Sequence, residues 1–218
     1  MCKKRVTDIK CVVFDLDGTL VDTSPGIIES VKYAVKEFNY PVLTQEQLLS
    51  FIGPPLKTSF IRCCGCDDLV AERLTETYRN YYRQGAILNA RLYDGIIELL
   101  KELYNADIQL TVATSKPQTF AEQIIFHFGL ERYLSAIRGA DIYGKLTKAD
   151  LISQCVKDFD LSGCIMVGDT VYDAKGAEET GISFIAVSYG FGNLKEIKAC
   201  RHVGVAQTPL DLLKMLCH

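Results

Sequence analysis

Residues 11–23 read CVVFDLDGTLVDT, a short apolar run that leads directly into three aspartates. The run 11–14 is continuously apolar, as is typical of a strand covered on both faces by other elements. Asp15 and Asp17 follow it, and they point to the same side because residues alternate sides along an extended chain. Two carboxylates ~4 Å apart repel by about 4 kcal/mol at an effective dielectric of 20. The pair therefore requires either a proton or a bound cation.

A second acidic cluster follows another apolar run, in the stretch IMVGDTVYD at residues 165–173. Gly168 ends the run, and Asp169 and Asp173 come after it. If a helix starts at this point, the i, i+4 spacing places both carboxylates on one side of it. Carboxylates gathered at two strand ends, without His or Cys, are typical ligands of a hard cation. The sequence therefore favours Mg²⁺ over Zn²⁺.

A third strand end carries groups suited to binding an anion. Thr114 and Ser115 follow the run LTVA, and Pro117 lies where a helix would begin. The N-terminus of a helix itself favours a negative charge. Lys145 and Lys148, in the stretch KLTKADLI, are the candidates for a fixed positive charge beside that anion. Hydroxyls, an ammonium and a cation together indicate phosphoryl transfer.

Composition limits the possible partners. The chain has 218 residues and a net charge of −3, whereas a nucleic-acid-binding protein usually presents a basic face. No apolar run approaches the ~20 residues that span a bilayer. Residues 1–15 (MCKKRVTDIKCVVFD) are unlike a signal peptide, because their apolar run is short and ends in acid. We expect a cytoplasmic protein that binds neither nucleic acid nor membrane, as a monomer or homodimer.

Strand-like runs alternate with helical patterns in most of the chain. Strands are predicted at 11–14, 110–113, 136–138, 164–167 and 183–187, and helices at 95–104, 117–128 and 148–159, the last with Thr147 as its N-cap. This alternation predicts an α/β fold with a parallel sheet.

The interval from residue 24 to about residue 90 reads as several helices without a strand. We expect it to be a helical cap inserted into an α/β core, because a crossover of some seventy residues is unusual. The predicted domains are residues 1–20 with 91–218 for the core and residues 21–90 for the cap. An elaborate crossover is the alternative.

The nine cysteines include one cluster, Cys63, Cys64 and Cys66 in RCCGC. A zinc site needs four ligands, and no second Cys pair or nearby His completes this set. The sequence therefore favours partly buried free thiols, and a redox role for them stays open.

Four ordered motifs resemble those of the haloacid dehalogenase-like hydrolases: DLDGTL, ATS, a lysine ahead of a helix, and GDTVYD. The resemblance runs from about residue 10 to residue 207. It implies a Rossmann-like three-layer α/β/α core, and the helical insert is similar to the small cap of a particular subgroup. That subgroup holds phosphoglycolate phosphatase, 5′-nucleotidase-like phosphatases and β-phosphoglucomutase.

The resemblance also implies roles for individual residues. Asp15 would attack phosphorus and become an aspartyl phosphate. Asp17 would protonate the leaving oxygen and then activate water, and its backbone carbonyl would help to hold the metal. Asp169 would bind Mg²⁺ and Asp173 would steady it, so the implied metal set is Asp15, Asp17, Asp169 and Asp173. Asp22 is left as a cap or hinge residue where the chain leaves for the insert.

The phosphate-binding residues implied are Thr114, Ser115 and a lysine. Gly144-Lys145 matches only the first half of the GKPxP stretch that many relatives carry, and nucleotidase-like relatives place the lysine at Lys148. We choose Lys148, with Lys145 as the alternative.

The implied activity is Mg²⁺-dependent hydrolysis of a small phosphorylated metabolite, like that of phosphoglycolate phosphatase or a 5′-nucleotidase. The alternatives are a phosphomutase or pyrophosphatase, and a signalling receiver phosphorylated on aspartate. In the cap, the stretch 52–60 (IGPPLKTSF) resembles a substrate-facing loop, where Lys57 would meet an anionic group or else lie in solvent.

Overall fold

The computed structural model describes residues 9–141 and 145–217. Two compact units are present, one formed by the chain up to Val21 and from Leu92 onward, the other by Asp22–Arg91. Residues 1–8, which contribute to the expectation of a cytoplasmic protein, and Gly144 lie outside the described residues. Within the described ranges, no helix has the length and apolar character needed to cross a membrane.

The first unit is built on a six-stranded parallel sheet with the strand order β5-β4-β1-β6-β7-β8. The strands are β1 (Cys11–Phe14), β4 (Gln109–Pro117), β5 (Ala136–Ala140), β6 (Cys164–Gly168), β7 (Ser183–Val187) and β8 (Gly204–Ala206). Every residue of the central strands β1 and β6 is buried, which explains their continuous apolar sequences.

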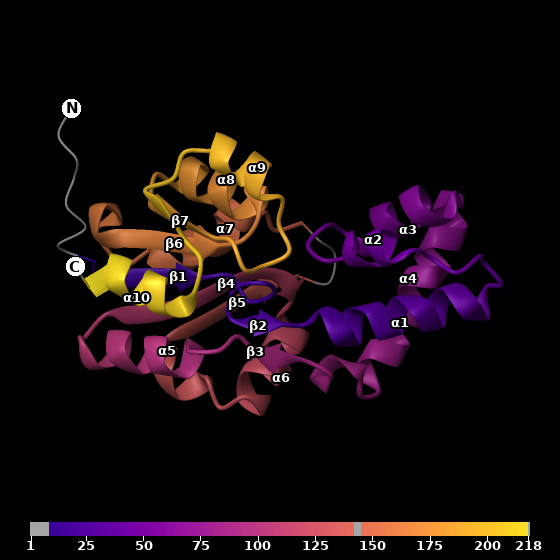
Figure 1. The fold of residues 1–218 in the computed structure, drawn as a ribbon, viewed down its shortest axis with the longest axis horizontal. Coiled ribbons are helices and arrows are strands. Elements are labelled where there is room, and N and C mark those ends of the chain that lie inside the picture. The colour runs from indigo at the N-terminus through magenta and orange to yellow at the C-terminus, as the bar shows by residue number, and fades with distance from the viewer. Residues whose placement is uncertain (1–8, 142–144, 218) are drawn as a thin grey trace. The chain divides into compact units, whose positions relative to one another are not determined.

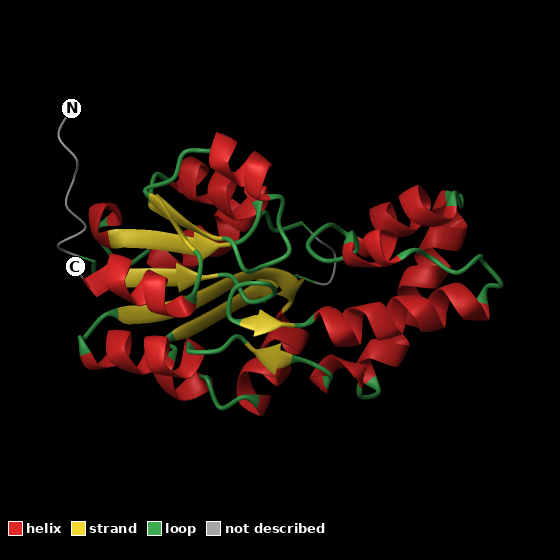
Figure 2. Cartoon of the chain, in the orientation of Figure 1, coloured by secondary structure: helices red, strands yellow, loops and turns green. Residues whose placement is uncertain are grey.

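Helices cover both faces of this sheet, as Figures 1 and 2 show. One face carries α5 (Ile96–Asn105), α6 (Gln118–His127) and α10 (Pro209–Cys217), and the other carries α7 (Lys148–Val156), α8 (Val171–Thr180) and α9 (Leu194–Ala199). Two short 3₁₀ helices, η2 (Glu131–Tyr133) and η3 (Leu161–Gly163), precede β5 and β6. The predicted Rossmann-like three-layer α/β/α core is confirmed.

The register of the three central strands places the end of β1 one residue before the end of β6 and beside the middle of β4. Phe14, the last residue of β1, lies beside Val112 of β4 and Val167 of β6. The residues that follow each of these positions therefore emerge together at one edge of the sheet, where open α/β sheets bind their ligands.

Capping residues fix where α7 and α8 begin. Thr147 forms a reciprocal capping box with Asp150, so Lys148 is the first residue of α7, as the predicted N-cap requires. Thr170 and Asp173 do the same for α8. Because α8 begins at Val171, Asp169 precedes the helix and its i, i+4 relation to Asp173 is not a helical one.

The second unit is helical, as expected for the insert. It contains α1 (Ser24–Glu37), α2 (Gln45–Leu49), α3 (Leu56–Cys64), α4 (Asp68–Arg83) and the 3₁₀ helix η1 (Ala86–Leu88). Gly65 adopts a left-handed conformation with φ 64° and ends α3, and the Asp67 side chain caps α4. Phe51 and Phe60 pack edge to face in its core.

Two short strands, β2 (Val21–Asp22) and β3 (Arg91–Leu92), pair where the chain enters and leaves the insert. The buried Asp22 carboxylate accepts hydrogen bonds from the Ser24 amide and hydroxyl at 3.0 and 2.6 Å, at the start of α1. It also pairs with the Arg91 guanidinium, at 2.9 Å from Nε and 2.8 Å from Nη2. Asp22 thus secures the start of the insert to its end.

Some elements differ from the sequence-based expectation. β4 extends to Pro117, so this proline precedes α6 instead of lying just inside it. The strands β2, β3 and β8 have only two or three residues, too few to produce an alternating or continuous apolar signal. Helices α9 and α10 were also not predicted.

We expect Asp22→Ala to lower the free energy of unfolding by about 1–3 kcal/mol, because it removes the carboxylate that accepts from the Ser24 amide and hydroxyl and from Arg91. Arg91→Met should cost less than about 1 kcal/mol, because the arginine side chain is largely exposed. Urea denaturation measures both, and equal losses in the two variants would contradict this ranking.

Candidate active site

A buried lysine joins two of the aspartates at the edge of the sheet. The ammonium Nζ of Lys148 lies 2.8 Å from Asp15 Oδ1 and 2.8 Å from Asp173 Oδ1, and it donates to the Ala113 carbonyl at 2.9 Å. The Asp15 amide donates to Val167 O at 2.9 Å, which continues the β1–β6 ladder one residue beyond Phe14. The capping box fixes the start of α7 and thus places the Lys148 ammonium beside the end of β1.

Asp169 is held by donors from two loops. The amides of Phe191 and Gly192 donate to its Oδ2 at 2.7 and 3.3 Å, and the Thr19 hydroxyl donates to its Oδ1 at 3.4 Å. The Tyr189 hydroxyl in turn donates to the Thr19 carbonyl at 3.1 Å. The loop after β7 therefore fixes the orientation of a carboxylate that follows β6.

Asp15, Asp169 and Asp173 form a group suited to a metal ion. One carboxylate oxygen from each lies within 4.8 Å of the others, and all three residues are buried. Within residues 9–141 and 145–217, this is the one such group of three or more metal-binding side chains. Three carboxylates face one ammonium, so the group has two negative charges in excess, which a divalent cation with oxygen ligands would balance.

Burial and repulsion between carboxylates raise the pKa values of Asp15 and Asp169. Burial raises the pKa of Asp15 to about 7 against the opposing effect of Lys148, and Asp173 adds repulsion. Burial also raises the pKa of Asp169 to about 8, with further repulsion from Asp173 and Asp15. Burial alone would lower the pKa of Lys148, but Asp15 and Asp173 outweigh it and raise that pKa. The ammonium therefore stays charged.

Gly18 allows the loop after β1 to pass close to Asp169. Its φ is +84°, in the left-handed region that favours glycine, and its amide donates to Val21 O at 2.9 Å. A Cβ atom at this position would collide with the Asp169 carboxylate. A residue without a side chain is therefore required between the two acidic segments.

Asp17 has a different partner from Asp15. Its Oδ1 lies 3.0 Å from Nζ of Lys116, and Asp17 does not belong to the three-carboxylate group above. Lys116 follows the hydroxyl residues at the end of β4 and is buried. Lys116 was not among the expected site residues, although its position two residues after Thr114 was the available signal. Thr19 and the Phe191 and Gly192 amides were also missed.

The remaining expected site residues differ in their positions. Thr114 is buried and its hydroxyl accepts a hydrogen bond from the Lys116 amide at 3.1 Å, whereas Ser115 is exposed. Lys145 is exposed, and its amide donates to Asp141. Lys57, in the helical unit, pairs with Asp68 at 2.6 Å. Lys148, the lysine chosen from the sequence, contacts Asp15 and Asp173.

The RCCGC thiols are free. Cys63 Sγ lies 3.7 Å from the Ser50 hydroxyl, and burial raises the pKa of Cys64 to about 11 and also raises the pKa of Cys66. Thiols with raised pKa values are protonated and poor nucleophiles at neutral pH.

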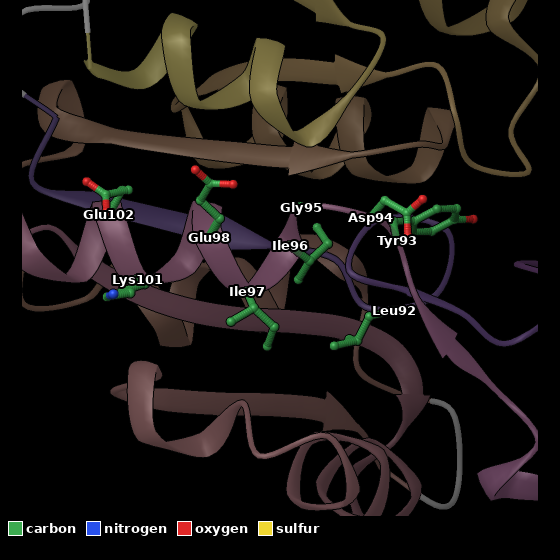
Figure 3. Close-up of a pocket in the computed structure, with 9 residues that line it drawn as sticks. All are labelled: Leu92, Tyr93, Asp94, Gly95, Ile96, Ile97, Glu98, Lys101 and Glu102. Atoms are coloured by element: carbon green, nitrogen blue, oxygen red, sulfur yellow. The ribbon is translucent and has the colours of Figure 1, made fainter.

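A separate open pocket of about 640 Å³ lies beside the start of α5 (Figure 3). Its lining includes Tyr93, Ile97, Glu98 and Lys101, and none of the residues of the aspartate cluster.

Comparison with known proteins gives a family match over most of the chain. The family model described as haloacid dehalogenase-like hydrolase matches residues 12–187. Among solved structures, a haloacid dehalogenase-like family hydrolase from Streptococcus pneumoniae aligns with a TM-score of 0.89 at 33% identity. That alignment covers 95% of this chain and 98% of the other.

Curated relatives carry several activities in their names. A 5′-nucleotidase of Pseudomonas aeruginosa is 38% identical over 191 residues, with 86% of each chain covered. A phosphoglycolate phosphatase of Vibrio parahaemolyticus is 26% identical, with 96% of each covered. The tyrosine-protein kinase PtkA of Mycobacterium tuberculosis is 34% identical over 83% of this chain, which spans 62% of that relative.

We expect a divalent cation to stabilise the protein by balancing the aspartate cluster. At 100 times its Kd, Mg²⁺ would contribute about 2.7 kcal/mol. In a chain of this size that contribution raises Tm by about 5–10 °C. Differential scanning calorimetry with Mg²⁺ and with EDTA measures the shift, and Asp169→Asn should reduce it.

The same cluster predicts a pH dependence in EDTA. The folded-state pKa of Asp169, about 8, lies above the usual value of about 3.9, so the folded protein binds more protons between these two values. Stability should therefore fall as pH rises from about 4 to about 8. Asp169→Asn should flatten the profile of Tm against pH, and a wild-type profile that rises over this range would contradict the prediction.

Proposed function

Because the chain belongs to the haloacid dehalogenase-like hydrolase family, we propose that it is a Mg²⁺-dependent phosphatase that acts through an aspartyl phosphate on Asp15. The observation that carries this proposal is the buried Asp15 carboxylate beside the Lys148 ammonium and the carboxylates of Asp169 and Asp173. The side chains of this group offer carboxylate oxygens and no nitrogen or sulfur ligand, which fits Mg²⁺.

In the proposed reaction, Asp15 attacks the phosphorus of a phosphomonoester. A bond forms between Asp15 and phosphorus while the bond to the ester oxygen breaks. Lys148 holds Asp15 in place for this attack and, with the Thr114 hydroxyl and the Ser115 amide, provides charge and donors for the phosphoryl oxygens. Mg²⁺, held by Asp15, Asp169, Asp173 and the Asp17 carbonyl, would supply further positive charge to those oxygens.

Asp17 moves the protons in both half-reactions. Its carboxyl group gives a proton to the leaving oxygen, and the resulting carboxylate then takes a proton from the water that attacks the aspartyl phosphate. This second step releases inorganic phosphate and restores Asp15. One water is consumed, and the products are an alcohol and phosphate.

A nucleoside monophosphate is the substrate class that we propose first, with phosphoglycolate second. The 5′-nucleotidase relative is more similar to this chain than the phosphoglycolate phosphatase relative, at 38% against 26% identity. The nucleotidase-like position of the lysine, at Lys148, agrees with that order.

Other phosphoryl-transfer activities differ in the phosphoryl donor or in the acceptor. A phosphomutase would return the phosphoryl group to the sugar, and a pyrophosphatase would release two phosphates. A receiver would keep the phosphoryl group on Asp15, but the acid/base Asp17 favours its hydrolysis. The similarity to PtkA makes a tyrosine hydroxyl a further acceptor to test.

We expect Asp15→Asn to reduce phosphate release from p-nitrophenyl phosphate by roughly 10³-fold or more, because the nucleophile is lost. Wild-type activity should require Mg²⁺, and mass spectrometry of quenched enzyme should find a hydroxylamine-sensitive phosphoryl adduct on Asp15. Asp158→Asn, at an exposed position, is the matched control. Full activity in Asp15→Asn would refute the mechanism.

Lys57 is proposed as a specificity residue for a second anionic group of the substrate. Lys57→Ala should then lower kcat/KM for phosphoglycolate by about 10-fold relative to p-nitrophenyl phosphate, the effect of roughly 1.4 kcal/mol. The competing role of Lys57 is its ion pair with Asp68. Asp68→Asn removes that pair while keeping the ammonium, so the same change in both variants would assign Lys57 a structural role.

A further inference from the structure

The Lys116–Asp17 ion pair is a second, largely buried charge pair, in addition to the contacts of Lys148 with Asp15 and Asp173. Nζ of Lys116 and Oδ1 of Asp17 are 3.0 Å apart, and the two side chains are only 6% and 16% exposed. Lysine is among the residues least often buried, because its ammonium loses hydration there. Burial of the Lys116 ammonium therefore costs stability, so we expect this side chain to have a role in the site.

The backbone around Lys116 holds its side chain at the site. Its amide donates to the Thr114 hydroxyl at 3.1 Å, and Pro117, the next residue, pairs with Ala140 of β5. Helix α6 begins directly afterwards, at Gln118. The backbone of Lys116 is thus fixed by β4 and by the start of α6, and its side chain extends toward the loop after β1.

Each acid of the DxD pair has a buried lysine beside it. Lys148 contacts Asp15 and Asp173, whereas Lys116 contacts Asp17. Asp17 lies in the loop that follows β1 and precedes Gly18, the residue with a positive φ, so β1 itself does not fix its carboxyl group. A cation on a neighbouring strand end supplies that constraint.

We propose that Lys116 is a positioning residue for Asp17, which holds the acid/base carboxyl group where the leaving oxygen departs. This inference rests on the proposed function. In the first half-reaction the phosphorus–ester bond breaks as the bond to Asp15 forms, and the Asp17 proton passes to the ester oxygen. In the second, attacking water gives its proton back to Asp17. Lys116 keeps the same carboxyl group in one position for both transfers.

Direct binding of a substrate anion by Lys116 would have different consequences. It would change KM for every substrate, regardless of how readily the leaving group departs. If the Asp17 carboxyl group is no longer held in position, by contrast, the rate falls most for substrates whose leaving oxygen needs a proton. Poor leaving groups, such as alkyl alcohols, need that proton, whereas p-nitrophenolate departs without it.

The test compares Lys116→Met with wild type on a series of substituted phenyl phosphates and on glycerol 2-phosphate. General acid catalysis contributes roughly 10²–10⁴-fold. We therefore expect kcat/KM, which reports the first half-reaction, to fall about 100-fold or more on glycerol 2-phosphate and less than about 10-fold on p-nitrophenyl phosphate. The dependence of rate on the leaving-group pKa should steepen accordingly. Lys116→Arg should recover most of the activity, and Lys101→Met, at an exposed position, is the matched control.

A double-mutant cycle then separates positioning from folding. If Lys116 acts through Asp17, adding Lys116→Met to Asp17→Asn should change kcat by less than about 2-fold. Thermal unfolding confirms that each variant is folded. An equal loss of kcat/KM on all leaving groups, a change in KM alone, or additive effects in the cycle would overturn the proposal. Failure of the proposed function would instead appear as activity that survives Asp15→Asn.

Discussion

The contact of one buried ammonium with two carboxylates organises the site. Lys148 reaches Asp15 directly after β1 and Asp173 in the first turn of α8, and it hydrogen-bonds the middle of β4 through the Ala113 carbonyl. Without this cation, the carboxylates would repel each other in a buried setting. Its position depends in turn on Thr147, which begins α7 one residue before the lysine.

The parallel sheet made most of the site predictable from sequence. Strands that run in the same direction end at the same edge, so the polar residues after each apolar run could be expected to meet there. The register confirms this, since Phe14, Val112 and Val167 lie level. The helical insert could also be predicted, because the sequence between residues 24 and 90 has helical patterns and lacks a strand-like run.

Contacts made by long side chains and by backbone amides could not be predicted in the same way. The sequence does not reveal whether the ammonium of a lysine is buried, so nothing distinguished Lys116 from the exposed lysines. The Phe191 amide holds Asp169 through backbone geometry, which leaves little trace in the sequence. The choice between Lys145 and Lys148 depended on where α7 begins, and helix ends are uncertain from sequence by one or two residues.

Gly18 has a consequence for how this gene tolerates mutation. Every single-base change that replaces this glycine adds at least a Cβ atom, directed at the Asp169 carboxylate, on a backbone that disfavours side chains. The atoms nearest to that Cβ all belong to Asp169, so such an allele acts first on the acidic group. The codon for Gly18 is therefore constrained by the site and not by the packing of the hydrophobic core.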